Sequence, residues 1–147
     1  TNEVTIHTAN VGKILSLQLE VNGVVAEEID GDGIIIASPT GSTSYALSVG
    51  GPIVDPSLKA FIVAPMAPFR HISSPLIIPA DKELSVKILG RKRAEIVIDG
   101  MHSFPLSSKD LLIITRSPNT ASFIRLEDNF YKKVYERLSF KGRKFKR

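Results

Sequence analysis

The sequence predicts a mainly β fold, an antiparallel sandwich, and three features of its 147 residues support this. Short runs rich in β-branched and aromatic residues recur along the chain. Pro, Gly, Asn and Asp separate nearly all of these runs, as expected for strands that end at turns. Few segments between the runs are long enough for the helices that connect parallel strands. We therefore expect one domain of antiparallel strands.

The clearest strand runs from Gly12 to Val21, where every second residue from Leu15 onward is apolar. This alternation buries one face of a strand. Asn22-Gly23 follows as a predicted type I′ hairpin turn, because both central positions of that turn need positive φ. Further strands are expected at 34–37, 61–64, 76–78, 84–89, 95–98, 111–115 and 122–126.

Two helices are expected among these strands. A short helix should begin near Ser42 and end at Gly50-Gly51, because glycine commonly ends helices. A C-terminal helix is expected from about Glu127 to Leu138, where apolar residues repeat every four positions.

Composition excludes several classes of protein and site. The hydrophobic content of 43% is normal for a soluble domain, and no apolar run is long enough to span a membrane. The chain opens without signal-peptide features, so we expect a cytoplasmic protein. It has no cysteine, and His7, His71 and His102 lack metal-ligand spacing. We expect no metal site in this chain.

The net charge of +4 arises from the C-terminal end. Residues 141–147 carry five positive charges and no negative ones, so the rest of the chain stands at 4 − 5 = −1. We expect a folded domain over 1–140 and a solvated, disordered basic tail over 141–147. Docking of this tail on RNA or polyphosphate is the alternative, but nothing else resembles a nucleic-acid-binding module.

The densest group of polar residues follows the strand at 34–37. Thr40, Ser42, Thr43 and Ser44 would surround a helix N-terminus, where free backbone N–H groups favour phosphate or ribose oxygens. The alternative is that Ser42 or Thr43 simply caps the helix. The residues alone leave both interpretations open.

Several motifs in sequence order together resemble the NAD kinase family. They are Asn2-Glu3, Gly31-Asp32-Gly33, Ser38-Pro39-Thr40-Gly41-Ser42-Thr43-Ser44-Tyr45, Gly50-Gly51-Pro52, Pro65-Met66-Ala67-Pro68 and Asp99-Gly100. The resemblance extends to about Leu138. It implies an antiparallel β-sandwich of the NAD kinase C-terminal domain type.

The resemblance also implies roles for individual residues. Asn2 and Glu3 would hold the ribose and phosphate region of NAD, with Glu3 accepting hydrogen bonds from ribose hydroxyls. Tyr45 would pack its ring against the adenine-ribose side. The full set of implied NAD-binding residues is Asn2, Glu3, Asp32, Thr40, Thr43, Ser44, Tyr45, Ser48, Ala67 and Phe69. Without the family, Asn2 and Glu3 could be an ordinary strand-edge pair and Tyr45 a core aromatic.

Asp32, Ala67 and Phe69 match positions that reach the dinucleotide of a neighbouring subunit, so the resemblance implies a homo-oligomer, either a dimer or a tetramer. Asp99 resembles the acidic residue near the transferred phosphate, although Met101 stands where many relatives carry Gln or His. Arg70 and His71 could contact phosphate or form a structural pair, and the residues leave this open.

NAD kinases move the γ-phosphoryl group of ATP, or a phosphoryl group of polyphosphate, to the 2′-hydroxyl of the adenosine ribose of NAD, which makes NADP. A divalent cation such as Mg²⁺ assists. The family's general base belongs to a Gly-Gly-Asp-Gly motif in an N-terminal Rossmann-like domain, and neither Gly31-Asp32-Gly33 nor Asp99-Gly100 has the paired glycines. We therefore expect half of a larger kinase, inactive alone.

Two other functions remain open. One is half of a lipid kinase of the diacylglycerol or sphingosine kinase type, which the polar surroundings of Thr43-Ser44-Tyr45 disfavour. The other is a non-catalytic nucleotide-binding module.

Overall fold

The computed structural model describes residues 1–10, 12–69, 73–122, 124 and 129–138. The chain divides into two compact units, Thr1–Arg116 and Ser117–Arg147. All ten strands of the described residues lie in the first unit, and a C-terminal helix lies in the second.

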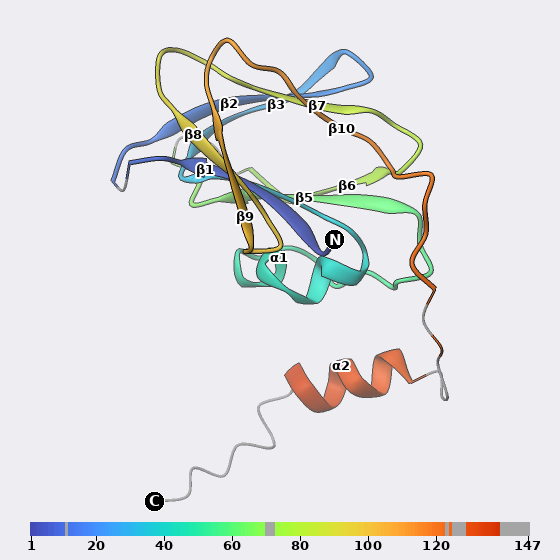
Figure 1. The fold of residues 1–147 in the computed structure, drawn as a ribbon. Helices are drawn as coiled ribbons and strands as arrows, with labels where there is room; N and C mark the ends of the chain where they lie inside the picture. The colour runs from blue at the N-terminus through green and yellow to red at the C-terminus, as the bar shows by residue number, and fades with distance from the viewer. Residues whose placement is uncertain (11, 70–72, 123, 125–128, 139–147) are drawn as a thin grey trace, which may run out of the picture. The chain divides into compact units, whose positions relative to one another are not determined.

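The first unit is a sandwich of two antiparallel sheets (Figure 1). The larger sheet has the order β6 (Leu76–Pro79), β5 (Ala60–Met66), β4 (Gly33–Ala37), β1 (Glu3–Thr8), β8 (Ala94–Ile98) and β9 (His102–Leu106). The smaller sheet has the order β10 (Leu112–Ile114), β7 (Leu84–Ile88), β2 (Leu15–Val21) and β3 (Val24–Gly31). The mainly β prediction is confirmed.

Two apolar clusters hold the sandwich together. The larger cluster lies between the sheets, where Leu17 of β2 and Ile34 of β4 are fully buried or nearly so. The smaller cluster lies on the opposite face of the larger sheet, where Ile35 of β4 and Ile62 of β5 pack with Ala46. Because side chains alternate along a strand, β4 supplies both clusters and is apolar throughout. Its five residues are all buried.

The hairpin prediction is confirmed by the backbone. Asn22 has φ +49° and Gly23 has φ +76°, the two positive angles that a type I′ turn requires. The second strand of this hairpin, β3, was not predicted, because Ile29 is the only core residue in a strand rich in acidic side chains.

Two other strands also escaped prediction. β1 mixes polar with apolar residues, and β9 carries Pro105, which normally argues against a central strand. β9 is an edge strand, so the missing N–H of Pro105 costs no ladder hydrogen bond. In the strand expected at 122–126, Ser122 and Ile124 are not in a strand, and the other three residues lie outside the described residues.

The helix expected to begin at Ser42 is two shorter pieces. A 3₁₀ helix spans Thr40–Thr43, and the α-helix α1 spans only Tyr45–Ser48. Ser44 separates them with φ −98° and ψ −134°, which is outside the helical region. The C-terminal helix is confirmed as α2 (Phe130–Leu138), and residues 127 and 128 of the predicted range lie outside the described residues. No helix among the described residues is long and apolar enough to cross a membrane.

Candidate functional site

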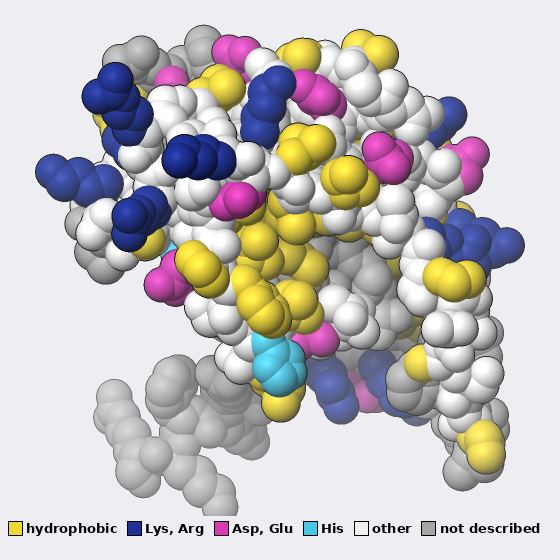
Figure 2. All heavy atoms as spheres, turned by 45° about the horizontal axis from the view of Figure 1, so that its top comes forward, with side chains coloured by type: hydrophobic (Ala, Val, Ile, Leu, Met, Phe, Trp, Pro, Cys, Tyr) yellow, Lys and Arg dark blue, Asp and Glu magenta, His cyan; other side chains and the backbone are white. Residues whose placement is uncertain are grey.

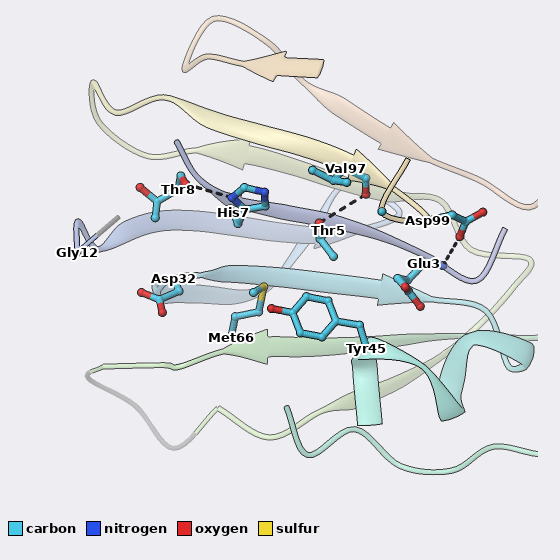
Figure 3. Close-up of a pocket in the computed structure, with 11 residues that line it drawn as sticks. Glu3, Thr5, His7, Thr8, Gly12, Asp32, Tyr45, Met66, Val97 and Asp99 are labelled. Atoms are coloured by element: carbon cyan, nitrogen blue, oxygen red, sulfur yellow. Dashed lines mark hydrogen bonds between the residues drawn. The ribbon is translucent and has the colours of Figure 1, made fainter. Parts of the chain in front are cut away.

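An open pocket of about 570 Å³ lies on the larger sheet, on the face opposite to the smaller sheet. On this face, α1 packs on β4 and β5 through Ala46. The neighbouring strand β1 is not covered by α1 and lines the pocket. Glu3, Asp32, Tyr45 and Asp99, four of the predicted site residues, line the pocket together (Figure 3). Its volume falls within the range of small-molecule sites, ~300–1,000 Å³.

The floor of the pocket is one face of β1. Glu3, Thr5 and His7 alternate with the inward residues Val4 and Ile6, so all three side chains point the same way. His7 donates through Nδ1 to the Thr8 carbonyl at 3.1 Å. Sequence reasoning left His7 unassigned and missed Thr5 and Thr8, although the polar-apolar alternation of 3–8 is a readable signal for a half-buried strand.

Residues from other loops and strands complete the lining. Val97 pairs with Thr5 across the β1–β8 ladder, Met66 ends β5, and Gly12 and Gly100 lie in turns. None of these four positions was predicted. Met66 and Gly100 lie in the motifs Pro65-Met66-Ala67-Pro68 and Asp99-Gly100, whereas only strand pairing brings Val97 to β1.

Glu3 is the most distinctive side chain of the pocket. It is 8% exposed, and its Oε1 accepts a hydrogen bond from the Ser44 hydroxyl at 3.3 Å. Its Oε2 has no hydrogen-bond partner among the described residues. A buried carboxylate oxygen without a donor is costly, so a hydrogen bond donated to this oxygen would stabilise the carboxylate.

Asp99 holds the N-terminal end of β1 in place. Its Oδ1 accepts the backbone N–H of Asn2 at 2.6 Å and that of Glu3 at 3.1 Å. Asp99 itself has φ +51° in the turn between β8 and β9. The Asp99 carboxylate therefore has a structural role in addition to any role toward a ligand. Asn2 is exposed and is not among the residues that line the pocket.

The two glycines around Asp32 let the chain pass closely between strands. A side chain at Gly31 would come within 2.6 Å of the Met66 carbonyl oxygen, and one at Gly33 would strike the Ile6 carbonyl. The Asp32 N–H donates to the Met66 carbonyl, and its own carbonyl accepts from the Thr8 N–H, both at 2.9 Å. The motif thus fixes the backbone of an aspartate whose side chain is exposed.

The hydroxyl-rich turn divides into structural and exposed groups. Ser42 is fully buried, where its Oγ accepts from the Val54 N–H at 3.0 Å and lies 3.2 Å from the Val54 carbonyl. The sequence left open whether Ser42 contacts a ligand or caps the helix, and the structure shows its hydroxyl bonded inside the fold to Val54 instead. Thr40, Thr43 and Ser48 are exposed but do not line the pocket.

Tyr45 is not a core residue. It is 43% exposed, and its ring extends along the pocket with the hydroxyl toward Met66 (Figure 3). Ala67 and Phe69 lie just beyond Met66 outside the lining, and Phe69 is 66% exposed. Arg70 and His71 lie outside the described residues.

The residues that the structure describes contain no group of three or more His, Asp or Glu side chains able to hold a metal ion. Among the described residues, three carboxylates line the pocket and no Lys or Arg does. Carboxylates accept hydrogen bonds, so this lining suits a ligand with hydroxyl groups.

Comparisons with known proteins identify the family of the chain. Residues 1–126 match the family model of the ATP-NAD kinase C-terminal domain. The chain is 42% identical over 141 residues to an NAD kinase of Methanosarcina mazei, which covers 95% of this chain and 49% of that protein. It is 40% identical over 140 residues to a bifunctional NADP phosphatase/NAD kinase of Methanocaldococcus jannaschii, which covers 95% of this chain and 24% of that protein.

Solved structures give the same result. Yeast NADH kinase in complex with NADH matches with a TM-score of 0.83 at 27% identity, over 97% of this chain and 44% of that chain. An NAD kinase from Archaeoglobus fulgidus in complex with ATP matches with a TM-score of 0.66 at 32% identity, over 80% and 49%. The chain spans about half the length of several of these relatives. It belongs to the NAD kinase family and corresponds to that family's C-terminal domain.

Proposed function

We propose that this chain is the NAD-binding and oligomerising part of an NAD kinase, which phosphorylates the 2′-hydroxyl of the adenosine ribose of NAD. The observation that carries the proposal is the Glu3 carboxylate, which is buried in the pocket with one oxygen unpaired among the described residues. A ribose offers vicinal hydroxyls, and each can donate the hydrogen bond that this oxygen lacks.

The other pocket residues fit the same ligand. The Ser44 hydroxyl orients the Glu3 carboxylate through their 3.3 Å hydrogen bond, and Tyr45 offers a half-exposed ring on which a base can stack. Asn2, Thr40, Thr43 and Ser48 are exposed near these two residues in sequence, and we assign them to the outer contacts of the dinucleotide.

The phosphoryl-transfer step needs groups beyond this chain. The 2′-oxygen forms a bond to the γ-phosphorus as the bond to the bridging oxygen breaks, and a base takes the hydroxyl proton. We assign the base, the binding of ATP or polyphosphate, and any divalent cation to the Rossmann-like half of the parent polypeptide. Asp99 lies beside Glu3 and would face the acceptor ribose. Its carboxylate would repel the negatively charged phosphate of the donor, so a cation is needed to offset this repulsion.

We also propose that the parent enzyme is a homo-oligomer and works in the cytoplasm. Exposed apolar side chains support the first proposal: Phe69 is 66% exposed, Phe104 is 50% exposed and Met101 is 79% exposed. Figure 2 shows apolar side chains gathered on one face of the molecule. Ala67 and Phe69 adjoin Met66 at the pocket, so an interface there would bring a second subunit to the ligand.

A lipid kinase fits the pocket less well. A lipid acceptor would need an apolar channel, whereas this lining includes Glu3, Asp32 and Asp99.

Glu3→Gln tests the proposal, since the substitution keeps the shape and removes the charge. We expect NAD to bind about five- to tenfold more weakly, because a hydrogen bond to a charged acceptor is worth ~1 kcal/mol more than a neutral one. The free energy of unfolding should not fall, since a buried charge with an unpaired oxygen disappears. An NMR titration with NAD and a urea unfolding curve measure the two quantities.

Glu83→Gln is the matched control, because Glu83 is exposed on the turn before β7 and lies outside the pocket. It should change neither quantity. Unaltered NAD affinity in Glu3→Gln, or no NAD binding by the unsubstituted chain, would overturn the proposal. When NAD, ATP and Mg²⁺ are added to the chain alone, no NADP should form.

A further inference from the structure

Four cationic side chains of the first unit gather at one corner of the sandwich. Lys13 lies in the loop between β1 and β2, and Arg91, Lys92 and Arg93 lie in the loop between β7 and β8. Both loops lie at the same end of the sandwich (Figure 1), and Figure 2 shows Lys and Arg side chains grouped at one side of the molecule. All four residues are exposed. We call these four residues the basic corner.

The charge of the basic corner contrasts with that of the rest of the first unit. Residues 1–116 carry ten Lys and Arg against twelve Asp and Glu, so outside the corner acidic side chains are twice as numerous as basic ones. The side chains of Lys13, Arg91 and Arg93 make no hydrogen bond or ion pair with any residue that the structure describes. Three of the four positive charges therefore have no compensating partner.

Hydrogen bonds join the two loops that carry these charges. The Lys92 ammonium donates to the Ile14 carbonyl, and Ile14 directly follows Lys13. The Ala9 N–H donates to the Arg93 carbonyl at 3.2 Å. The cations therefore sit on backbone segments that are already connected, so an anion that binds here does not have to bring the loops together.

The backbone of the second loop also offers free donors. Gly90 has φ +88°, in the left-handed region. The N–H groups of Gly90, Arg91 and Lys92 donate to no described residue. Successive N–H groups beside a residue of this conformation can form a concave site for an anion, and guanidinium and ammonium groups add charge-assisted hydrogen bonds to phosphate oxygens. The basic corner therefore combines the two kinds of donor that bind phosphate.

We propose that the basic corner binds a linear oligophosphate, either the triphosphate of a nucleotide or a short stretch of inorganic polyphosphate. Four cations suit a chain that carries roughly one negative charge per phosphate. Residues 9–14 and 89–93 include no aromatic residue, so these loops offer no ring on which the bases of a single-stranded nucleic acid could stack. The site is separate from the pocket, because none of the four cations lines it.

NMR titrations of the full chain with sodium tripolyphosphate test the proposal. We expect the amide signals of Gly90, Arg91 and Lys92 to shift, and the affinity to fall as salt is added. Combining Arg91→Gln with Arg93→Gln should weaken binding about five- to tenfold, because two charged contacts are lost. The same pair of substitutions should make the salt dependence shallower.

A matched pair of substitutions removes the same charge elsewhere in the first unit. Lys59→Gln combined with Lys82→Gln alters the residue before β5 and a residue in the turn before β7, and should leave the affinity for tripolyphosphate unchanged. Residues 141–147 are identical in both variants, so the basic C-terminal end contributes equally to the two measurements.

Parallel titrations with ATP, long-chain polyphosphate and a uridine-only RNA identify the ligand. Binding of both inorganic chains without ATP would support the inorganic source, and equal affinity for ATP and tripolyphosphate would support the nucleotide. The proposal fails if no oligophosphate shifts the amide signals at 90–92, or if the matched pair weakens binding as much as the arginine pair. Tighter binding of the RNA than of polyphosphate of equal charge would also overturn it.

Discussion

At the scale of single residues, the hydroxyl-rich motif combines two kinds of side chain that look alike in the sequence. Ser42 is sealed inside the fold and bridges to both backbone groups of Val54. Thr43, its neighbour, is exposed. Some hydroxyl groups of the motif therefore stabilise the loop, and others face solvent. The sequence does not distinguish the two kinds, whereas their burial in the structure does.

Ser42→Ala should therefore destabilise the first unit by about 1–3 kcal/mol, because it leaves the Val54 N–H buried without a partner. Thr43→Ala is the matched control and should change the free energy of unfolding by less than about 0.5 kcal/mol. Urea unfolding curves measure both. Equal effects of the two substitutions would show that the Ser42 hydroxyl does not hold the loop.

At the scale of elements, polar cross-strand contacts support the smaller sheet. Glu20 of β2 accepts a hydrogen bond from the Lys87 ammonium of β7 at 2.8 Å and one from Ser85 at 3.3 Å. The Lys87 hydrogen bond and charge, with the Ser85 hydrogen bond, hold the pKa of Glu20 below its usual value. This lowering of the pKa links the pairing of β2 with β7 to pH.

A carboxyl whose pKa is lower in the folded state stabilises the fold above its unfolded pKa and loses that contribution as pH falls through the folded pKa. We expect stability to decline below roughly pH 4 and Glu20→Gln to make this decline shallower. Urea unfolding across a pH series measures it, with Glu83→Gln as the control. A decline of the same steepness in Glu20→Gln would exclude this pair as a contributor.

At the scale of the whole molecule, the first unit contains everything that the sandwich needs. Every strand of the described residues and both apolar clusters lie before Arg116. The Phe130 and Tyr131 rings of α2 contact each other edge to face within the second unit, with centroids 5.2 Å apart.

Deletion of residues 117–147 should therefore leave a domain that unfolds cooperatively. We expect its Tm to differ from that of the full chain by less than about 4 °C, equivalent to less than ~1 kcal/mol. Differential scanning calorimetry of the two chains measures this. A broad or missing transition in the shorter chain would mean that the second unit contributes to the core.

The sequence by itself determined the local features of this protein. The alternation from Leu15 onward specifies β2, Asn22-Gly23 specifies its turn, and the ordered motifs identify the family. These features are readable because side-chain periodicity and positive φ depend on near neighbours. Glu3, Asp32, Tyr45 and Asp99 were named as site residues only through the resemblance of these motifs to the family.

Only the tertiary structure decided how these residues meet. β1 lies between β4 and β8. Asp99 therefore accepts hydrogen bonds from the backbone N–H groups of Asn2 and Glu3, which lie 97 and 96 positions before it in the sequence. The same pairing adds Thr5, His7 and Val97 to the pocket, and burial assigns Ser42 to the core. Strand order and burial follow from the packing of two sheets over a shared core, which no local pattern contains.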